Sequence, residues 1–91
     1  MTKYKKKGIL RKYNNSYLIF NDKKLTYELN EIGARIFTLC NGDENSSFDE
    51  ILKKIALYYT TTEEEICEDL SAYISTLLYY EIIEKVKEER F

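Results

Sequence analysis

The sequence contains no histidine, tryptophan or proline, and only three glycines among its 91 residues. Histidine is the commonest general base and the commonest metal ligand, so its absence removes the side chain on which many catalytic and metal sites depend. The few glycines form neither a phosphate-binding loop nor a nucleophile elbow. Without proline or glycine-rich stretches there is no flexible linker, and the length suits one small domain. We therefore expect a single domain over residues 1–91 that is not an enzyme and uses no cofactor.

The only two cysteines, Cys40 and Cys67, fall on the apolar faces of predicted helices. This placement predicts reduced thiols that pack as small hydrophobic side chains. Two cysteines without histidine make a poor zinc site, and their spacing gives no disulfide signal. No stretch approaches the ~20 apolar residues that a transmembrane helix needs, and the basic start lacks the apolar segment of a secretory signal. We expect a cytoplasmic protein without a metal ion or a membrane partner.

Charge is segregated along the chain, although the net charge is only −2. Residues 1–27 carry seven lysines and one arginine against one aspartate, whereas residues 28–91 carry six basic and fifteen acidic residues. Such segregation bears on partners more than on fold. Residues 1–7 are expected to be a solvated basic arm, with the steering of an acidic partner as the alternative, and residues 87–91 a frayed tail.

Two strands are predicted in the first part of the chain. Residues 8–13 are rich in strand formers and end at Asn14-Asn15, a turn pair that tolerates positive φ. Residues 16–20 (SYLIF) are continuously apolar, which is typical of a central strand covered on both faces.

A third strand is predicted over residues 24–29. Leu25, Tyr27 and Leu29 share one face and polar residues occupy the other, which indicates one buried and one solvated face. The connecting turns are short, so we expect an antiparallel three-stranded meander with this strand at an edge.

Three amphipathic helices follow the strands, which makes the fold class α+β. Asn30 is suited to cap a first helix over residues 31–40, and Asn41-Gly42 is suited to end it. A capping box over residues 47–50 begins the second helix.

Three overlapping capping boxes in residues 60–65 begin the third helix, which is expected to run to about Tyr80. Its apolar residues are Ile66, Leu70, Ile74 and Leu77, flanked by Cys67, Tyr73, Leu78 and Tyr80. They cover an arc of about 160°, wider than the usual apolar stripe. We expect one flank to cover something besides the domain's own core.

A small sheet with three helices can also form a winged-helix nucleic-acid-binding protein, which is the alternative function. Such a protein presents lysine and arginine from a helix to phosphates and base edges. The third helix instead begins with Glu63, Glu64, Glu65, Glu68 and Asp69, and no basic residue occurs there before Lys85. Because affinity for DNA comes largely from cation–phosphate contacts, no nucleic-acid partner is expected.

The edge strand over residues 24–29 suggests peptide binding as another function. An exposed edge presents unpaired amides and carbonyls with which an extended peptide can pair. A charged edge that binds nothing is the competing interpretation, and an adaptor or a dimer joined through two edges is a third possibility.

The chain resembles the PqqD-like proteins, also called RiPP recognition elements, which bind the leaders of ribosomally made, post-translationally modified peptides. The resemblance rests on Leu29-Asn30-Glu31, Ala34, Ile36-Phe37 and Leu39-Cys40-Asn41-Gly42, and continues with Phe48, Ile51, Leu52, Ile55, Tyr59, Ile66, Asp69, Leu70, Tyr73, Ile74, Leu77 and Leu78. It spans about residues 8–83. The chain departs from it at Asn41, where many members have aspartate, and at Glu81, where many have glycine.

The resemblance implies a winged helix-turn-helix-like fold in which a leader adds as a fourth antiparallel strand, in a cleft walled by the third helix. The peptide-binding residues it implies are Lys24, Leu25, Thr26, Tyr27 and Glu28 on the strand, Asp69, Tyr73 and Thr76 on the helix, and Leu70 and Leu77 beneath them. The opposite flank, with Cys67, Ser71 and Leu78, is the competing wall, and ordinary core packing is the alternative for each apolar residue.

The function implied is that of a stand-alone peptide chaperone. Its partners are expected to be a precursor peptide and a modifying enzyme, such as a radical-SAM maturase, or a leader peptidase of the lasso-peptide type.

Overall fold

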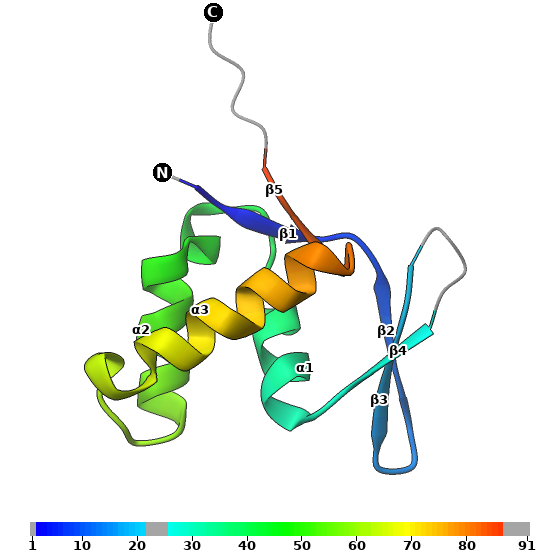
Figure 1. Cartoon of the computed structure of the whole chain (residues 1–91), viewed down its shortest axis with the longest axis horizontal. Helices are drawn as coiled ribbons and strands as arrows, with labels where there is room; N and C mark the ends of the chain where they lie inside the picture. The colour runs from blue at the N-terminus through cyan, green and yellow to red at the C-terminus, as the bar shows by residue number, and fades with distance from the viewer. Residues whose placement is uncertain (1, 22–25, 87–91) are drawn as a thin grey trace, which may run out of the picture.

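The structure is a computed structural model that describes residues 2–21 and 26–86. Its elements in chain order are β1 (Tyr4–Lys6), β2 (Ile9–Tyr13), β3 (Ser16–Phe20), β4 (Thr26–Leu29), α1 (Glu31–Thr38), the 3₁₀ turn η1 (Glu44–Ser46), α2 (Phe48–Tyr58), α3 (Glu63–Tyr79) and β5 (Ile83–Lys85). Figure 1 shows the β2–β3–β4 sheet to one side of the helices and the β1–β5 pair above them. The α+β class and the three-stranded antiparallel sheet followed by three helices are therefore as predicted.

The sheet is a meander of order β2-β3-β4 with antiparallel pairing throughout. Asn14 takes the predicted left-handed conformation, with φ of 54°, in the tight turn that pairs Tyr13 with Ser16. Ile19 lies opposite Leu10 on β2 and opposite Tyr27 on β4, and it is fully buried. The strand predicted from a continuous apolar run is thus the central strand of the sheet.

The prediction that β3 is covered on both faces is wrong. Ile19 faces the core, but Phe20 is 37% exposed and its cross-strand partner Ile9 is 57% exposed. Neighbouring residues of a strand point to opposite faces, so the face that carries Phe20 is left open by the described elements.

The prediction of a solvated basic arm is wrong for Tyr4–Lys6, because these residues form β1 and pair with β5. Tyr4 is buried in the core, and Lys5 Nζ lies 3.2 Å from Glu84 Oε1 on the paired strand. The backbone N–H of Lys6 donates to the carbonyl of Cys40 at 3.1 Å. The segment is therefore held by an apolar anchor, by backbone pairing and by charge pairing.

Each of the three helices begins at a side-chain cap that the sequence predicted. Asn30, Ser47 and Thr62 accept hydrogen bonds from the backbone N–H of Gly33, Glu50 and Glu65, at 2.9, 3.3 and 3.2 Å. Such a bond satisfies one of the amides that a helix leaves free in its first turn. Of the three overlapping boxes before α3, the chain uses the one that starts at Thr62.

The end of α1 lies two residues before the predicted one. The backbone N–H of Leu39 and that of Cys40 donate to the carbonyls of Ile36 and Phe37, which tightens the last turn. Gly42 then takes φ of 74°, as predicted for this stop.

Helix α3 ends in a Schellman motif. The N–H of Ile82 donates to the carbonyl of Leu77 at 2.9 Å, and the N–H of Glu81 donates to the carbonyl of Leu78 at 3.1 Å. This geometry places Glu81 at φ of 58°, where glycine is the usual residue. Ile82 and Leu77 are both buried, so the apolar contact that accompanies the motif is part of the core.

One core joins both sheets and the three helices. Its most buried members are Ile19, Ile36, Phe37, Cys40, Ile51, Ile55, Leu70, Ile74, Leu77, Ile82 and Ile83. Both cysteines are free thiols, with Cys40 buried and Cys67 partly buried. Among the described residues, no helix is both long and apolar enough to cross a membrane.

Candidate functional site

Strand β4 forms one edge of the sheet, and β3 is its only partner among the described strands. Along it Thr26 and Glu28 are exposed, whereas Tyr27 and Leu29 are half-buried against the core. The predicted alternation of a buried and a solvated face is therefore present. The edge opposite β3 carries backbone groups that no described strand pairs, which makes it available for strand addition.

Two predicted strand residues, Lys24 and Leu25, lie outside the described residues, as do Asp22 and Lys23. The described part of the candidate strand is therefore Thr26, Tyr27 and Glu28.

Helix α3 faces β4 through one stripe of its surface. The ring of Tyr80, which caps this helix, lies 5.2 Å from the ring of Tyr27, centroid to centroid. Seven residues earlier, Tyr73 Oη accepts a hydrogen bond of 2.6 Å from Asn30 Nδ2, directly after β4. Residues seven apart share a helix face, so these two contacts define the side of α3 that is turned toward the edge strand.

Asp69 and Thr76 lie on the same stripe as Tyr73, because they are four residues before it and three after it. Both are exposed. The Thr76 hydroxyl donates to the carbonyl of Ala72 at 3.0 Å, whereas Asp69 has no hydrogen bond or ion pair with a described residue. The competing flank, centred on Ser71, lies on the opposite side of the helix.

Leu70 and Leu77, which were expected beneath the wall, are only 2% and 1% exposed. They belong to the core and offer almost no surface to a bound molecule. They hold α3, which carries Tyr73, against the core, and core packing was the alternative given for each apolar residue.

Asn30 and Tyr80 are additional candidates that the sequence did not place at the site. Asn30 was predicted only as a cap, yet its side chain accepts from Gly33 N–H through Oδ1 and donates to Tyr73 through Nδ2. Tyr80 was predicted only as part of a wide apolar arc. The seven-residue spacing between Tyr73 and Tyr80 was the available signal, since it puts both phenols on one face.

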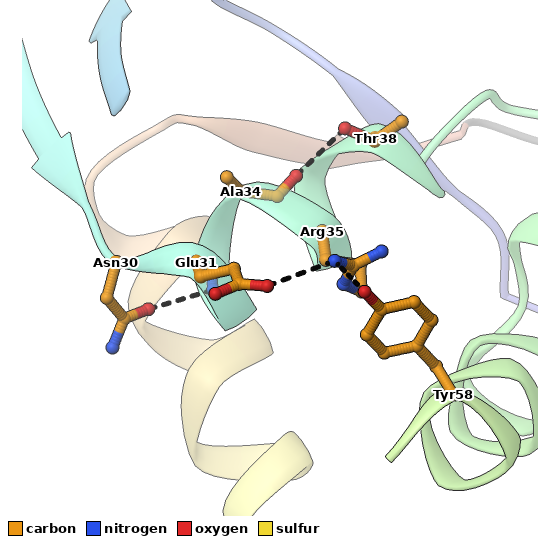
Figure 2. Close-up of polar contacts among 7 residues, drawn as sticks. Asn30, Glu31, Ala34, Arg35, Thr38 and Tyr58 are labelled. Atoms are coloured by element: carbon orange, nitrogen blue, oxygen red, sulfur yellow. Dashed lines mark hydrogen bonds and ion pairs between the residues drawn. The ribbon is translucent and has the colours of Figure 1, made fainter. Parts of the chain in front are cut away.

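A second polar cluster lies on α1 (Figure 2). Arg35 Nη2 donates to Glu31 Oε1 at 3.2 Å and to Tyr58 Oη at 2.6 Å, and its guanidinium stacks 3.4 Å from the Tyr58 ring centroid. The cluster joins α1 to α2 and holds the Arg35 side chain in place on the face of α1 that adjoins β2.

The described residues contain no group of three or more histidine, cysteine or acidic side chains that could hold a metal ion. Burial raises the pKa of the Cys40 thiol to about 11, and the nearby Lys6 ammonium only partly offsets this. A buried, protonated thiol is a poor nucleophile. The chemistry of the site is therefore that of backbone pairing, phenolic and carboxylate side chains, and apolar surface.

Comparisons with known proteins match the chain to one family. The family model described as Coenzyme PQQ synthesis protein D (PqqD) matches residues 17–83. The solved structure of TbiB1 in complex with the TbiA(beta) leader peptide is similar, with a TM-score of 0.72 and 18% sequence identity, over 94% of this chain and 99% of that one. No curated protein matches the chain. Because the family model covers most of the sequence, including β3 except Ser16, β4 and all three helices, the chain belongs to the PqqD family.

Proposed function

We propose that the protein binds the leader of a ribosomally made precursor peptide as an added strand on β4. The observation that carries the proposal is the outer edge of β4, which no described strand pairs and beside which α3 is held by the Tyr27–Tyr80 and Asn30–Tyr73 contacts. The similar TbiB1 structure, which was solved with a leader peptide, supports this use of the fold.

In this proposal the leader runs antiparallel to β4 and pairs with the backbone of Thr26, Tyr27 and Glu28, and of Lys24 and Leu25 before them. Leader side chains on the helix-facing side lie against the stripe of Asp69, Tyr73, Thr76 and Tyr80. Backbone pairing supplies affinity that depends little on sequence, and the phenols and the carboxylate supply selectivity.

The protein itself carries out no chemistry in this proposal. It holds the precursor, in the cytoplasm, for an enzyme on another chain, such as a radical-SAM maturase or a leader peptidase of the lasso-peptide type. The alternative of nucleic-acid binding gains no support, because Glu63, Glu64, Glu65, Glu68 and Asp69 are all exposed at the start of α3.

The test is a calorimetric titration of the protein with leader peptides of precursors encoded beside its gene. Thr26→Pro removes one backbone amide at the first residue of β4, a position where a strand tolerates proline. If that amide pairs with the leader, its loss costs about 1–3 kcal/mol and raises the Kd by roughly 5- to 150-fold.

Lys12→Pro is the matched control, because it removes an amide that points away from β3 on the other edge strand. We expect this variant to bind the leader as the wild type does. Circular dichroism would verify that both variants are folded. Wild-type affinity in folded Thr26→Pro, or equal losses in the two variants, would contradict strand addition at β4.

A further inference from the structure

The sheet has a second edge, on β2, which no described strand other than β3 pairs. This strand pairs with β3 alone, and no backbone hydrogen bond joins residues 9–13 to any other described segment. In an antiparallel strand every second residue directs its N–H and C=O away from its neighbour, and the register leaves those of Leu10 and Lys12 pointing outward. The use proposed for β4 leaves this edge unoccupied.

Apolar side chains lie on the outer face beside this edge. Ile9 is 57% exposed and Tyr13 is 54% exposed, and Phe20 lies opposite Ile9 on β3. Arg11 lies between Ile9 and Tyr13 on the same face, so this face combines exposed apolar side chains with a cation.

A hollow of about 270 Å³ lies on the inner face of the same edge. It is lined by Leu10 and Tyr17 from the sheet, and by Ala34, Thr38 and Leu39 at α1, with the Glu31–Arg35 pair beside them. The contacts in Figure 2 fix this wall, because Arg35 is held by both Glu31 and Tyr58. The hollow has the size and lining to accept an apolar side chain from a strand added to β2.

The edge is positively charged. Arg11 and Lys12 point to opposite faces of β2, and neither has an ion pair with a described residue. Lys12 Nζ lies over the Tyr17 ring, 5.5 Å from its centroid. Pairing of two copies through β2 would bring four such cations together, and like charges across a strand pair are destabilising. The charge therefore favours an acidic occupant over a second copy.

We propose that the β2 edge and the hollow beside α1 dock an extended acidic segment of the enzyme that receives the leader. Its backbone extends the sheet, an apolar side chain enters between Leu10 and Ala34 on the inner face, and acidic side chains on the outer face approach Arg11, while Lys12 adds to the positive charge of the edge. The domain then holds the leader on one edge of its sheet and the enzyme on the other. The identity of the occupant rests on the proposed leader binding, whereas the binding of an acidic extended segment at β2 does not.

The probe is a fluorescein-labelled heptapeptide that alternates glutamate with leucine, compared with the same peptide carrying lysine in place of glutamate. Fluorescence anisotropy at low salt measures binding to the full chain. We expect the glutamate peptide to bind and the lysine peptide to bind at least about tenfold more weakly. In ¹⁵N-resolved spectra the amide shifts should gather at Leu10, Arg11 and Ala34 and leave Tyr27 unmoved.

Arg11→Glu/Lys12→Glu should weaken the glutamate peptide at least about tenfold. The matched control is Lys53→Glu/Lys54→Glu, which makes the same charge change at exposed positions of α2 and should have little effect. Thr38→Phe, at the exposed rim of the hollow, should also weaken binding without altering charge.

Undetectable binding of the glutamate peptide, equal binding of the lysine peptide, equal effects of the two double variants, or shifts centred on β4 would overturn the proposal. Leader titration is measured separately on the same variants. If the wild-type protein binds the heptapeptide but not the leader, the result would contradict the leader proposal alone.

Discussion

Asn30 joins three elements of this fold, and its replacement gives the most detailed test of the structure. It follows β4, its Oδ1 caps α1 at Gly33, and its Nδ2 holds Tyr73 on α3. Asn30→Ala removes both functions. Loss of a good N-cap costs about 1 kcal/mol, and loss of an exposed hydrogen bond about 0.5–1 kcal/mol, so the free energy of unfolding should fall by about 1.5–2 kcal/mol.

Asn30→Ser separates the two functions. Serine caps helices about as well as asparagine, but its shorter side chain does not reach Tyr73. This variant and Tyr73→Phe should each lose only the interhelical hydrogen bond, about 0.5–1 kcal/mol. Combining them should cost no more than either alone, because both remove the same bond.

Urea unfolding followed by circular dichroism measures the free energy of unfolding of the wild type and of these four variants. With no tryptophan in the chain, tyrosine fluorescence is the natural second probe. Fully additive losses for Asn30→Ser and Tyr73→Phe would show that the two side chains do not interact in solution. The inferred orientation of α3 toward β4 would then lose one of its two contacts.

The remaining predictions concern the helix ends and the thiols. Thr60→Gly should raise the free energy of unfolding by about 0.5–1 kcal/mol in urea titrations, because Thr60 occupies a left-handed cap at φ of 53°. Glu81→Gly relieves the same conformation at φ of 58° but also removes the 3.3 Å ion pair of Glu81 with Lys7, so its gain should be smaller; lower stability of Thr60→Gly would contradict the cap geometry. In the native protein a thiol reagent at neutral pH should modify Cys67 well before Cys40, whereas both react in urea, and equally fast native modification would contradict the burial of Cys40. In the folded protein the pKa of the Cys40 thiol is raised to about 11, so the protonated thiol stabilises the fold fully below the unfolded thiol pKa. This stabilisation is lost as the pH rises toward 11. Cys40→Ala should therefore show a smaller alkaline loss of stability than the wild type.

The strands and caps could be predicted because their signals are local. The apolar run of residues 16–20 matches β3 in both bounds, and Asn30, Ser47 and Thr62 cap the helices through side chains that a linear pattern reveals. A cap needs only a residue and the amide three positions later, so no knowledge of the tertiary fold is required.

The β1–β5 pair could not be predicted because it joins residues about eighty positions apart. Tyr4 lies opposite Lys85, and each strand has only three residues, too few for a periodic signal. A lysine-rich segment was therefore taken as solvated, although its single tyrosine enters the core and Glu84 pairs with its charge. The choice of flank on α3 was also left open, since an apolar arc shows that a face is covered but not which element covers it.

The contacts of β4 explain why this edge is the better candidate for the leader, although β2 is also an edge that only β3 pairs among the described strands. An added strand has to order its own side chains, and affinity rises when the receiving surface is already ordered. The wall beside β4 is fixed in two places, at Tyr73 through Asn30 and at Tyr80 through Tyr27. The wall beside β2 is α1, held to α2 by Arg35 and Tyr58, with a hollow rather than a continuous stripe. The continuous stripe beside β4 favours contacts with several consecutive residues of a peptide. The hollow beside β2 favours the binding of one apolar residue among charged ones. The two sites also differ in charge, because the acidic Asp69 belongs to the α3 stripe and the basic Arg11 belongs to the β2 edge.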